Sequence, residues 1–203
     1  MAISIPGLPD PIDGNGPIVL LGANGSGKTR LAVQMANAGN AEFIPALRNI
    51  AVPDQIPNWT LQTATSELQN RTNQRRNSYW ELVPDIDALF GKLWSSHAVE
   101  AMRVYDEVLR GAQPQDLPET VLSKTKELWR AVFPGRSIAF TDFTARVTNE
   151  YLGSTTYTAK HMSDGERTGL YLAGSVFDSS HPVVVVDEPE THFHSRIAVR
   201  FWD

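Results

Sequence analysis

The stretch that decides the fold is Gly22-Ala23-Asn24-Gly25-Ser26-Gly27-Lys28-Thr29. It fits the pattern GxxxxGK[ST]. It follows an apolar run, Ile18 to Leu21, that predicts a buried strand, and it opens a segment, Lys28 to Ala38, that predicts a helix. Glycines allow the backbone N–H groups of such a loop to approach phosphate oxygens closely. The stretch therefore predicts a phosphate-binding loop between a strand and a helix.

The polar residues of this loop have separate expected roles. Lys28 is expected to reach the β- and γ-phosphates of a nucleotide, and the Thr29 hydroxyl to ligate Mg²⁺. The alternative is a glycine turn that only caps a helix, and the order of strand, loop and helix disfavours it. The predicted nucleotide-binding residues of this region are Gly22, Asn24, Gly25, Ser26, Gly27, Lys28, Thr29 and Arg30.

A second candidate segment is the run of four valines, Val183 to Val186, followed by Asp187 and Glu188. The run predicts a fully buried parallel strand that delivers two carboxylates at its carboxyl end, where open α/β sheets bind ligands. We expect Asp187 to hold Mg²⁺, and Glu188 to act with Lys28 in catalysis by activating the attacking water. A strand that runs into a solvated acidic turn is the alternative, and pairing with the phosphate loop disfavours it.

The segment Ser163-Asp164-Gly165-Glu166 opens a helix that is expected to end near Phe177. Ser163 followed three residues later by Glu166 predicts a capping box. The amino-terminal end of such a helix, with Ser163 and Gly165, can also receive an anion. Both interpretations can hold together, so Ser163 and Gly165 are candidate phosphate contacts.

These residues resemble the ABC-type ATPases, in the branch that includes the structural-maintenance-of-chromosomes, RecF-like and overcoming-lysogenization-defect proteins. The resemblance rests on the phosphate loop, on the signature-like Met162 to Glu166, and on Val183 to Glu188 continuing into Pro189-Glu190-Thr191-His192-Phe193-His194. The last stretch is similar to the DEPE-x-H-L-H segment of bacterial AAA-type ATPases that are found with, or fused to, Toprim-type nuclease domains. Phe-Ile-Pro-Ala-Leu-Arg at 43–48 matches the same subgroup.

The resemblance implies an α/β P-loop NTPase fold, an ABC-type ATPase head with a mixed sheet and an inserted helical subdomain. It implies a head-to-tail homodimer that forms with ATP, in which Ser163 and Gly165 of one copy complete the site of the other. It further implies Mg²⁺-dependent ATP hydrolysis in DNA repair or anti-phage defence, with a Toprim-type nuclease as partner or fused domain. The rival hypothesis is a non-catalytic, ATP-dependent dimerisation switch that regulates a partner. A transporter ATPase is disfavoured by the long helical stretch.

The sequence departs from the family pattern in several places. Asp164 stands where many relatives have glycine, and the Q-loop residue is ambiguous between Gln55 and Arg48. His194 comes too early for the switch histidine, which is expected beyond residue 203. Because Arg196 to Asp203 predicts a helix without a stop signal, we expect the chain to be the amino-terminal part of a longer protein.

The organisation expected along the chain is one domain in three parts. These are a phosphate-loop lobe at 1–59, a helical insert at 60–136, and a signature and acidic-strand part at 137–203. Helices are predicted at 61–76, 86–97, 99–109 and 121–132, and strands at 3–5, 42–47, 138–140, 145–148 and 155–158. The segment 60–136 is thus expected to be helical, whereas the segment 137–203 is expected to contain strands as well.

Composition restricts the function classes. The chain has 203 residues, a formal net charge of -5, no cysteine and no long apolar run, which predicts a cytoplasmic protein without membrane spans or disulfides. A negative net charge disfavours a general nucleic-acid binder, so contact with nucleic acid is expected to be indirect or local. A short basic helix face, Arg71, Arg75 and Arg76, could touch nucleic acid but is interpreted mainly as a solvated face.

Overall fold

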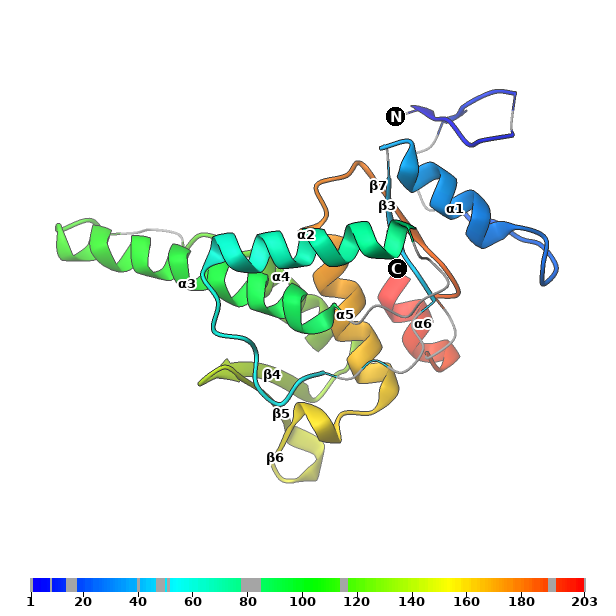
Figure 1. The fold of residues 1–203 in the computed structure, drawn as a ribbon. Helices are drawn as coiled ribbons and strands as arrows, with labels where there is room; N and C mark the ends of the chain where they lie inside the picture. The colour runs from blue at the N-terminus through cyan, green and yellow to red at the C-terminus, as the bar shows by residue number, and fades with distance from the viewer. Residues whose placement is uncertain are drawn as a thin grey trace.

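The computed structural model describes residues 2–7, 9–13, 18–39, 41–46, 50, 52–77, 85–113, 117–189 and 193–202. Helices and strands are mixed along the chain, so the fold is of the α/β kind (Figure 1). The helices are α1 (Lys28–Asn37), α2 (Leu61–Asn77), α3 (Ile86–Leu109), α4 (Val121–Val132), α5 (Asp164–Asp178) and α6 (Ser195–Trp202). The strands are β1 (Ala2–Ile3), β2 (Ile12–Asp13), β3 (Ala41–Ile44), β4 (Arg136–Thr141), β5 (Thr144–Asn149), β6 (Thr155–Thr158) and β7 (Val183–Val186). Two 3-10 turns, η1 (Glu150–Leu152) and η2 (Ala159–His161), flank β6.

The helical part follows the sequence prediction closely, with one difference. The expected helices at 61–76 and 121–132 are confirmed as α2 and α4. The segments 86–97 and 99–109, expected as two helices, form the single helix α3. Ala98 lies between them, and alanine is the strongest helix former, so nothing in the local sequence ends the first segment. Figure 1 shows α2 lying alongside the first half of α3.

The described strands form three small sheets, and no single mixed sheet joins them. The strands β3 and β7 pair in parallel, with Ala41 opposite Val183 and Ile44 opposite Val186. The strands β4, β5 and β6 form an antiparallel meander, and β1 pairs with β2. The parallel pair is the part that matters for the predicted site, because β7 leads directly into Asp187.

The strand predicted at Ile18 to Leu21 is not formed, and its expected burial is wrong. This segment has no regular secondary structure, and the exposed fractions of Val19 and Leu21 are 74% and 90%. An apolar run specifies that a segment favours burial, but a strand also needs a neighbouring strand to share its hydrogen bonds. Within the described part of the chain, this segment has no such neighbour.

Three clusters of buried side chains hold the described elements in place, and the smallest joins Ile5, Met35 and Ala41. The larger core joins α3, α4, α5 and the β4–β5 hairpin, and its most buried large side chains include Phe90, Leu93, Trp129, Val147 and Leu170. A smaller cluster, Ala32, Val33, Ala36 and Phe43, packs α1 onto the parallel pair, with Val185 against it. The smaller cluster fixes the position of α1, and therefore of the loop that precedes it, relative to the end of β7.

Candidate nucleotide-binding site

The glycine-rich loop before α1 has the backbone shape that its sequence requires. Gly25 and Gly27 have φ angles of 81° and 92°, in the left-handed region that favours glycine. The N–H of Ser26 donates to the carbonyl oxygen of Ala23 at 3.1 Å, which closes a turn inside the loop. The residues from Gly22 to Gly27 are exposed, so the loop is open to a ligand.

Close approach also explains the first glycine of the loop. A Cβ atom built on Gly22 would lie 2.5 Å from the Ser26 Oγ, which is shorter than any normal contact. Any larger residue at position 22 would therefore displace the Ser26 side chain. Asn24 within the loop and Arg30 at the start of α1, also predicted to bind nucleotide, are exposed.

Lys28 lies in the first turn of α1 and folds back over the loop. Its ammonium donates to the carbonyl oxygens of Gly22 at 2.7 Å and of Ala23 at 3.2 Å. These bonds hold the positive charge at the mouth of the loop, at the amino-terminal end of a helix that has no acidic residue in its first turn. The helix dipole and the lysine therefore add to a positive potential in the same place.

Thr29 and Asp187 meet across the site. The Thr29 hydroxyl donates a hydrogen bond of 2.7 Å to the Asp187 Oδ2, between residues 158 positions apart in the chain. The two oxygens come from the two segments that the sequence analysis assigned to Mg²⁺. The structure thus brings together the two predicted metal ligands.

Asp187 is placed by the strand pair. Its backbone N–H donates to the carbonyl oxygen of Ile44 at 2.9 Å, which continues the β3–β7 ladder by one residue. The valines of β7 are only partly buried, so the expectation of a fully buried strand is wrong. Val184 and Val186 pack against the larger core, and Val183 and Val185 pack against the smaller clusters, but among the described strands only β3 pairs with β7.

Glu188 is exposed and turns the chain at the end of β7. Its φ is 47°, a left-handed conformation that is unfavourable for a residue with a long side chain. Such conformations occur where the surroundings enforce them, and functional sites are common among those places. Glu188, whose carboxylate is predicted to activate water, directly follows Asp187, the predicted metal ligand.

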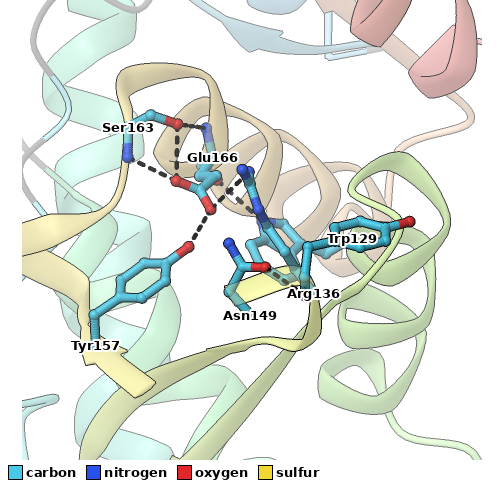
Figure 2. Close-up of polar contacts among 7 residues, drawn as sticks. Trp129, Arg136, Asn149, Tyr157, Ser163 and Glu166 are labelled. Atoms are coloured by element: carbon cyan, nitrogen blue, oxygen red, sulfur yellow. Dashed lines mark hydrogen bonds and ion pairs between the residues drawn. The ribbon is translucent and has the colours of Figure 1, made fainter. Parts of the chain in front are cut away.

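The predicted capping box at the start of α5 is confirmed. The Ser163 Oγ accepts from the Glu166 N–H at 3.3 Å and donates to the Glu166 Oε2 at 2.8 Å, and the Ser163 N–H donates to the same oxygen at 2.7 Å (Figure 2). The Ser163 hydroxyl therefore already has two partners within its own helix. Gly165 lies in the first turn of this helix and is partly buried.

Glu166 is the centre of a polar network that the sequence did not reveal. Its Oε1 accepts from Arg136 Nη1 of β4 at 3.1 Å and from the Tyr157 hydroxyl of β6 at 2.5 Å, and its side chain is 4% exposed (Figure 2). Its backbone oxygen accepts from the Trp129 Nε1 of α4 at 3.1 Å. Burial, and then the hydrogen bond to Glu166, raise the pKa of Tyr157 well above its ordinary value. Glutamate at the third helical position was a visible signal, but its partners on distant strands were not.

The start of α5 lies away from the phosphate loop of the same chain. Figure 1 shows the amino-terminal ends of α1 and α5 well separated in the view. The described hydrogen bonds of Ser163 go to Glu166, and those of Lys28 go to the loop. Within one copy, Ser163 and Gly165 are therefore not brought to the site formed by Lys28, Thr29 and Asp187.

Of the remaining motif residues, Phe193 is buried in the larger core, Gln55 and His194 are exposed, and others lie outside the described residues. Gln55 is exposed, and the N–H of the next residue, Ile56, donates to the Phe143 carbonyl oxygen at 2.6 Å. This bond holds the segment against the β4–β5 turn. His194 is exposed before α6. The alternative Q-loop residue Arg48 lies outside the described residues, as do Glu190, Thr191 and His192.

The solvated basic face expected on α2 is wrong for Arg75, which is buried. Arg75 is 5% exposed and pairs with the buried Asp85 at 2.8 Å, while Arg71 contacts Glu67 and Asp87. Both guanidinium groups lie where α2 meets the start of α3. Their contacts are therefore with carboxylates of the same chain. Arg75 is therefore buried away from a nucleic acid, Arg71 is partly exposed, and the side chain of Arg76 lies outside the described residues.

Among the described residues, no group of three or more histidine, cysteine, aspartate or glutamate side chains could hold a metal ion by itself. No described helix is both long enough and apolar enough to cross a membrane.

Comparison with known proteins gives no relative. No protein-family model matches the chain, and no curated protein and no solved structure matches it significantly.

Proposed function

We propose that this chain binds ATP together with Mg²⁺ and hydrolyses it. The observation that carries the proposal is the 2.7 Å hydrogen bond between the Thr29 hydroxyl and the Asp187 carboxylate. One partner follows a glycine-rich loop, and the other ends a parallel strand. This combination supplies a phosphate cradle and two metal-ligand oxygens at one place.

Each residue then has a defined task. The loop N–H groups and Lys28 bind the phosphates, and Lys28 exchanges its two loop carbonyl oxygens for phosphate oxygens. Thr29 and Asp187 hold Mg²⁺, which would neutralise charge that develops on the β- and γ-phosphates. Glu188 orients the water for in-line attack and accepts its proton.

The second part of the proposal concerns assembly. Because the start of α5, which carries Ser163 and Gly165, lies apart from the start of α1 (Figure 1), we expect these two residues to approach the nucleotide of a second copy in a head-to-tail dimer. The resemblance in sequence further suggests a role in DNA repair or anti-phage defence in the cytoplasm, with a Toprim-type nuclease as partner.

Two substitutions test the reaction. Lys28→Ala should abolish ATP binding in a titration followed by calorimetry, because it removes the charge at the loop. The matched control is Lys124→Ala, which removes a lysine from α4. Wild-type affinity in Lys28→Ala would refute the proposed phosphate site.

Turnover is tested separately from binding. Glu188→Gln should keep ATP binding and stop phosphate release, because an amide cannot accept the proton of water. Glu150→Gln, at another exposed glutamate, is the matched control. Unchanged phosphate release in Glu188→Gln would remove the proposed base. Nucleotide binding and ATP-dependent dimerisation without turnover by the wild type would instead establish the non-catalytic switch.

A further inference from the structure

The second half of α3 carries an apolar surface that nothing covers in the described structure. Figure 1 shows this half continuing beyond the amino-terminal end of α2 and away from the other helices. The exposed fractions are 61% for Met102, 57% for Tyr105 and 67% for Leu109. We call the α3 stripe the set of exposed residues Ala98, Ala101, Met102, Tyr105, Val108 and Leu109.

The spacing of these residues places them on one face. Positions 98, 102, 105 and 109 recur every three or four residues, which is the spacing of a helical seam. The nearby charged residues Glu100, Arg103 and Glu107 lie on the opposite face, where Arg103 pairs with both glutamates at 2.5 Å. The charged residues of the polar face therefore pair with one another, while the apolar face remains in water at a cost in free energy.

We propose that the α3 stripe of one copy packs antiparallel against the α3 stripe of a second copy. In the register that aligns the seam, Met102 faces Tyr105 of the second copy, and Ala98 faces Leu109. Beside the seam, Ala101 faces Val108. Each small residue thus meets a larger one, as close packing requires. A parallel pair would instead place Ala98 against Ala98, which leaves a void, and Tyr105 against Tyr105, where the two large side chains overlap.

The distribution of charge also favours a second copy over a charged partner. No lysine, arginine, aspartate or glutamate belongs to the α3 stripe, so the stripe offers nothing to recognise an acidic or a basic ligand. Asp106 is at the edge, and in the antiparallel register it faces Val99 and not another Asp106. A two-fold pair therefore brings no like charges together.

The size of the surface predicts a weak dimer. Residues 98–109 span about 18 Å of helix. One such face is smaller than the roughly 800 Å² per partner that stable complexes bury. We therefore expect a dissociation constant in the micromolar range or above. Figure 1 places this half of α3 far from α1, so the contact needs no nucleotide and is separate from the proposed ATP-dependent dimer.

Sedimentation equilibrium without nucleotide tests the contact. The wild-type chain should form a dimer as its concentration rises. Met102→Glu should weaken that dimer by about tenfold or more, because it buries a carboxylate in the seam. Arg103→Gln makes the same change in net charge on the opposite face and should leave the dimer unchanged. A monomer at every concentration, or a dimer that tolerates Met102→Glu, would overturn the proposal.

The orientation has its own test, since the chain contains no cysteine. An equal mixture of Ala98→Cys and Leu109→Cys should form a disulfide-linked heterodimer under mild oxidation. Each variant alone should not, because in the antiparallel register identical positions lie about 16 Å apart along the helix, well beyond disulfide reach. Efficient self-linking of Ala98→Cys, with no mixed product, would refute the antiparallel register. All these measurements are made without ATP, so failure of the proposed ATPase would leave their outcome unaffected.

Discussion

Thr29 and Asp187 are joined by a hydrogen bond of 2.7 Å from the Thr29 hydroxyl to the Asp187 Oδ2. The hydroxyl belongs to the first turn of α1, and the carboxylate follows the last residue of β7. Nothing in the local sequence of either segment requires this contact. It arises because α1 packs onto the β3–β7 pair, which points the end of β7 at the loop.

The first prediction concerns the Thr29 hydroxyl. Thr29→Val keeps the shape of the side chain and removes the oxygen, so we expect ATP affinity in Mg²⁺ to fall by about tenfold, or about 1.4 kcal/mol. Thr29→Ser keeps the oxygen and should stay near the wild type. The measurement is a calorimetric ATP titration with Mg²⁺ and with a chelator present. If Thr29→Val lost equal affinity in both conditions, the hydroxyl would not act through the metal.

The second prediction concerns the network around Glu166. Glu166→Ala leaves the Ser163 N–H without its carboxylate acceptor and leaves Tyr157 and Arg136 without theirs. Arg136 is 35% exposed, so water compensates part of the loss. We expect the free energy of unfolding, measured by urea denaturation, to fall by about 1–3 kcal/mol.

A control separates the network from general surface effects. Glu127→Ala removes an exposed glutamate from the neighbouring helix α4 and should change the free energy of unfolding by less than about 0.5 kcal/mol. Equal stability of Glu166→Ala and Glu127→Ala would show that the buried network contributes nothing. ATP binding by the monomer should be unaffected in either variant, because both positions lie away from the phosphate loop.

Much of the local structure could be predicted from the sequence. Helices α2 and α4 have clear helical spacing, and Ser163 with Glu166 specifies its own cap within four residues. The loop from Gly22 to Gly27 could be predicted equally well, because its glycines take conformations that other residues avoid. These features depend on neighbours in the chain, and local sequence therefore determines them.

Features that depend on neighbours far away in the chain could not be predicted from the sequence. The run Ile18 to Leu21 is apolar enough for a strand, but its sequence does not say whether another strand lies beside it. Arg75 looks like a surface residue beside Arg71 and Arg76, and only the fold places it against Asp85 and Tyr171. In both cases the sequence gives the preference of a segment, and tertiary packing decides the outcome.

Arg75 of α2, Asp85 just before α3 and Tyr171 of α5 form a buried polar contact that joins these three helices. The Tyr171 hydroxyl donates to the Asp85 Oδ1 at 2.8 Å and accepts from the Arg75 Nη1 at 2.6 Å. The three residues are 2–6% exposed, so water cannot replace these bonds. Burial raises the pKa of Tyr171, the nearby Arg75 acts in the opposite direction, and the charge of Asp85 raises it further.

The third prediction follows from the raised pKa of Tyr171. In the unfolded chain this phenol ionises near its ordinary pKa of 10.0, whereas in the folded chain it stays protonated to higher pH. The folded state therefore binds more protons above about pH 10, so its stability from this group is complete below that pH and falls as pH rises. Tyr171→Phe should flatten the alkaline fall by up to about 1.4 kcal/mol per pH unit.

Urea denaturation at several pH values from neutral to strongly alkaline measures this fall. Tyr151→Phe, at the exposed tyrosine of η1, is the matched control and should follow the wild-type curve. Tyrosinate absorbance of the folded wild type gives an independent reading, since Tyr171 should remain protonated until the protein unfolds. Parallel curves for Tyr171→Phe and the wild type would mean that the phenol ionises equally in both states. Such a result would contradict its burial between Arg75 and Asp85.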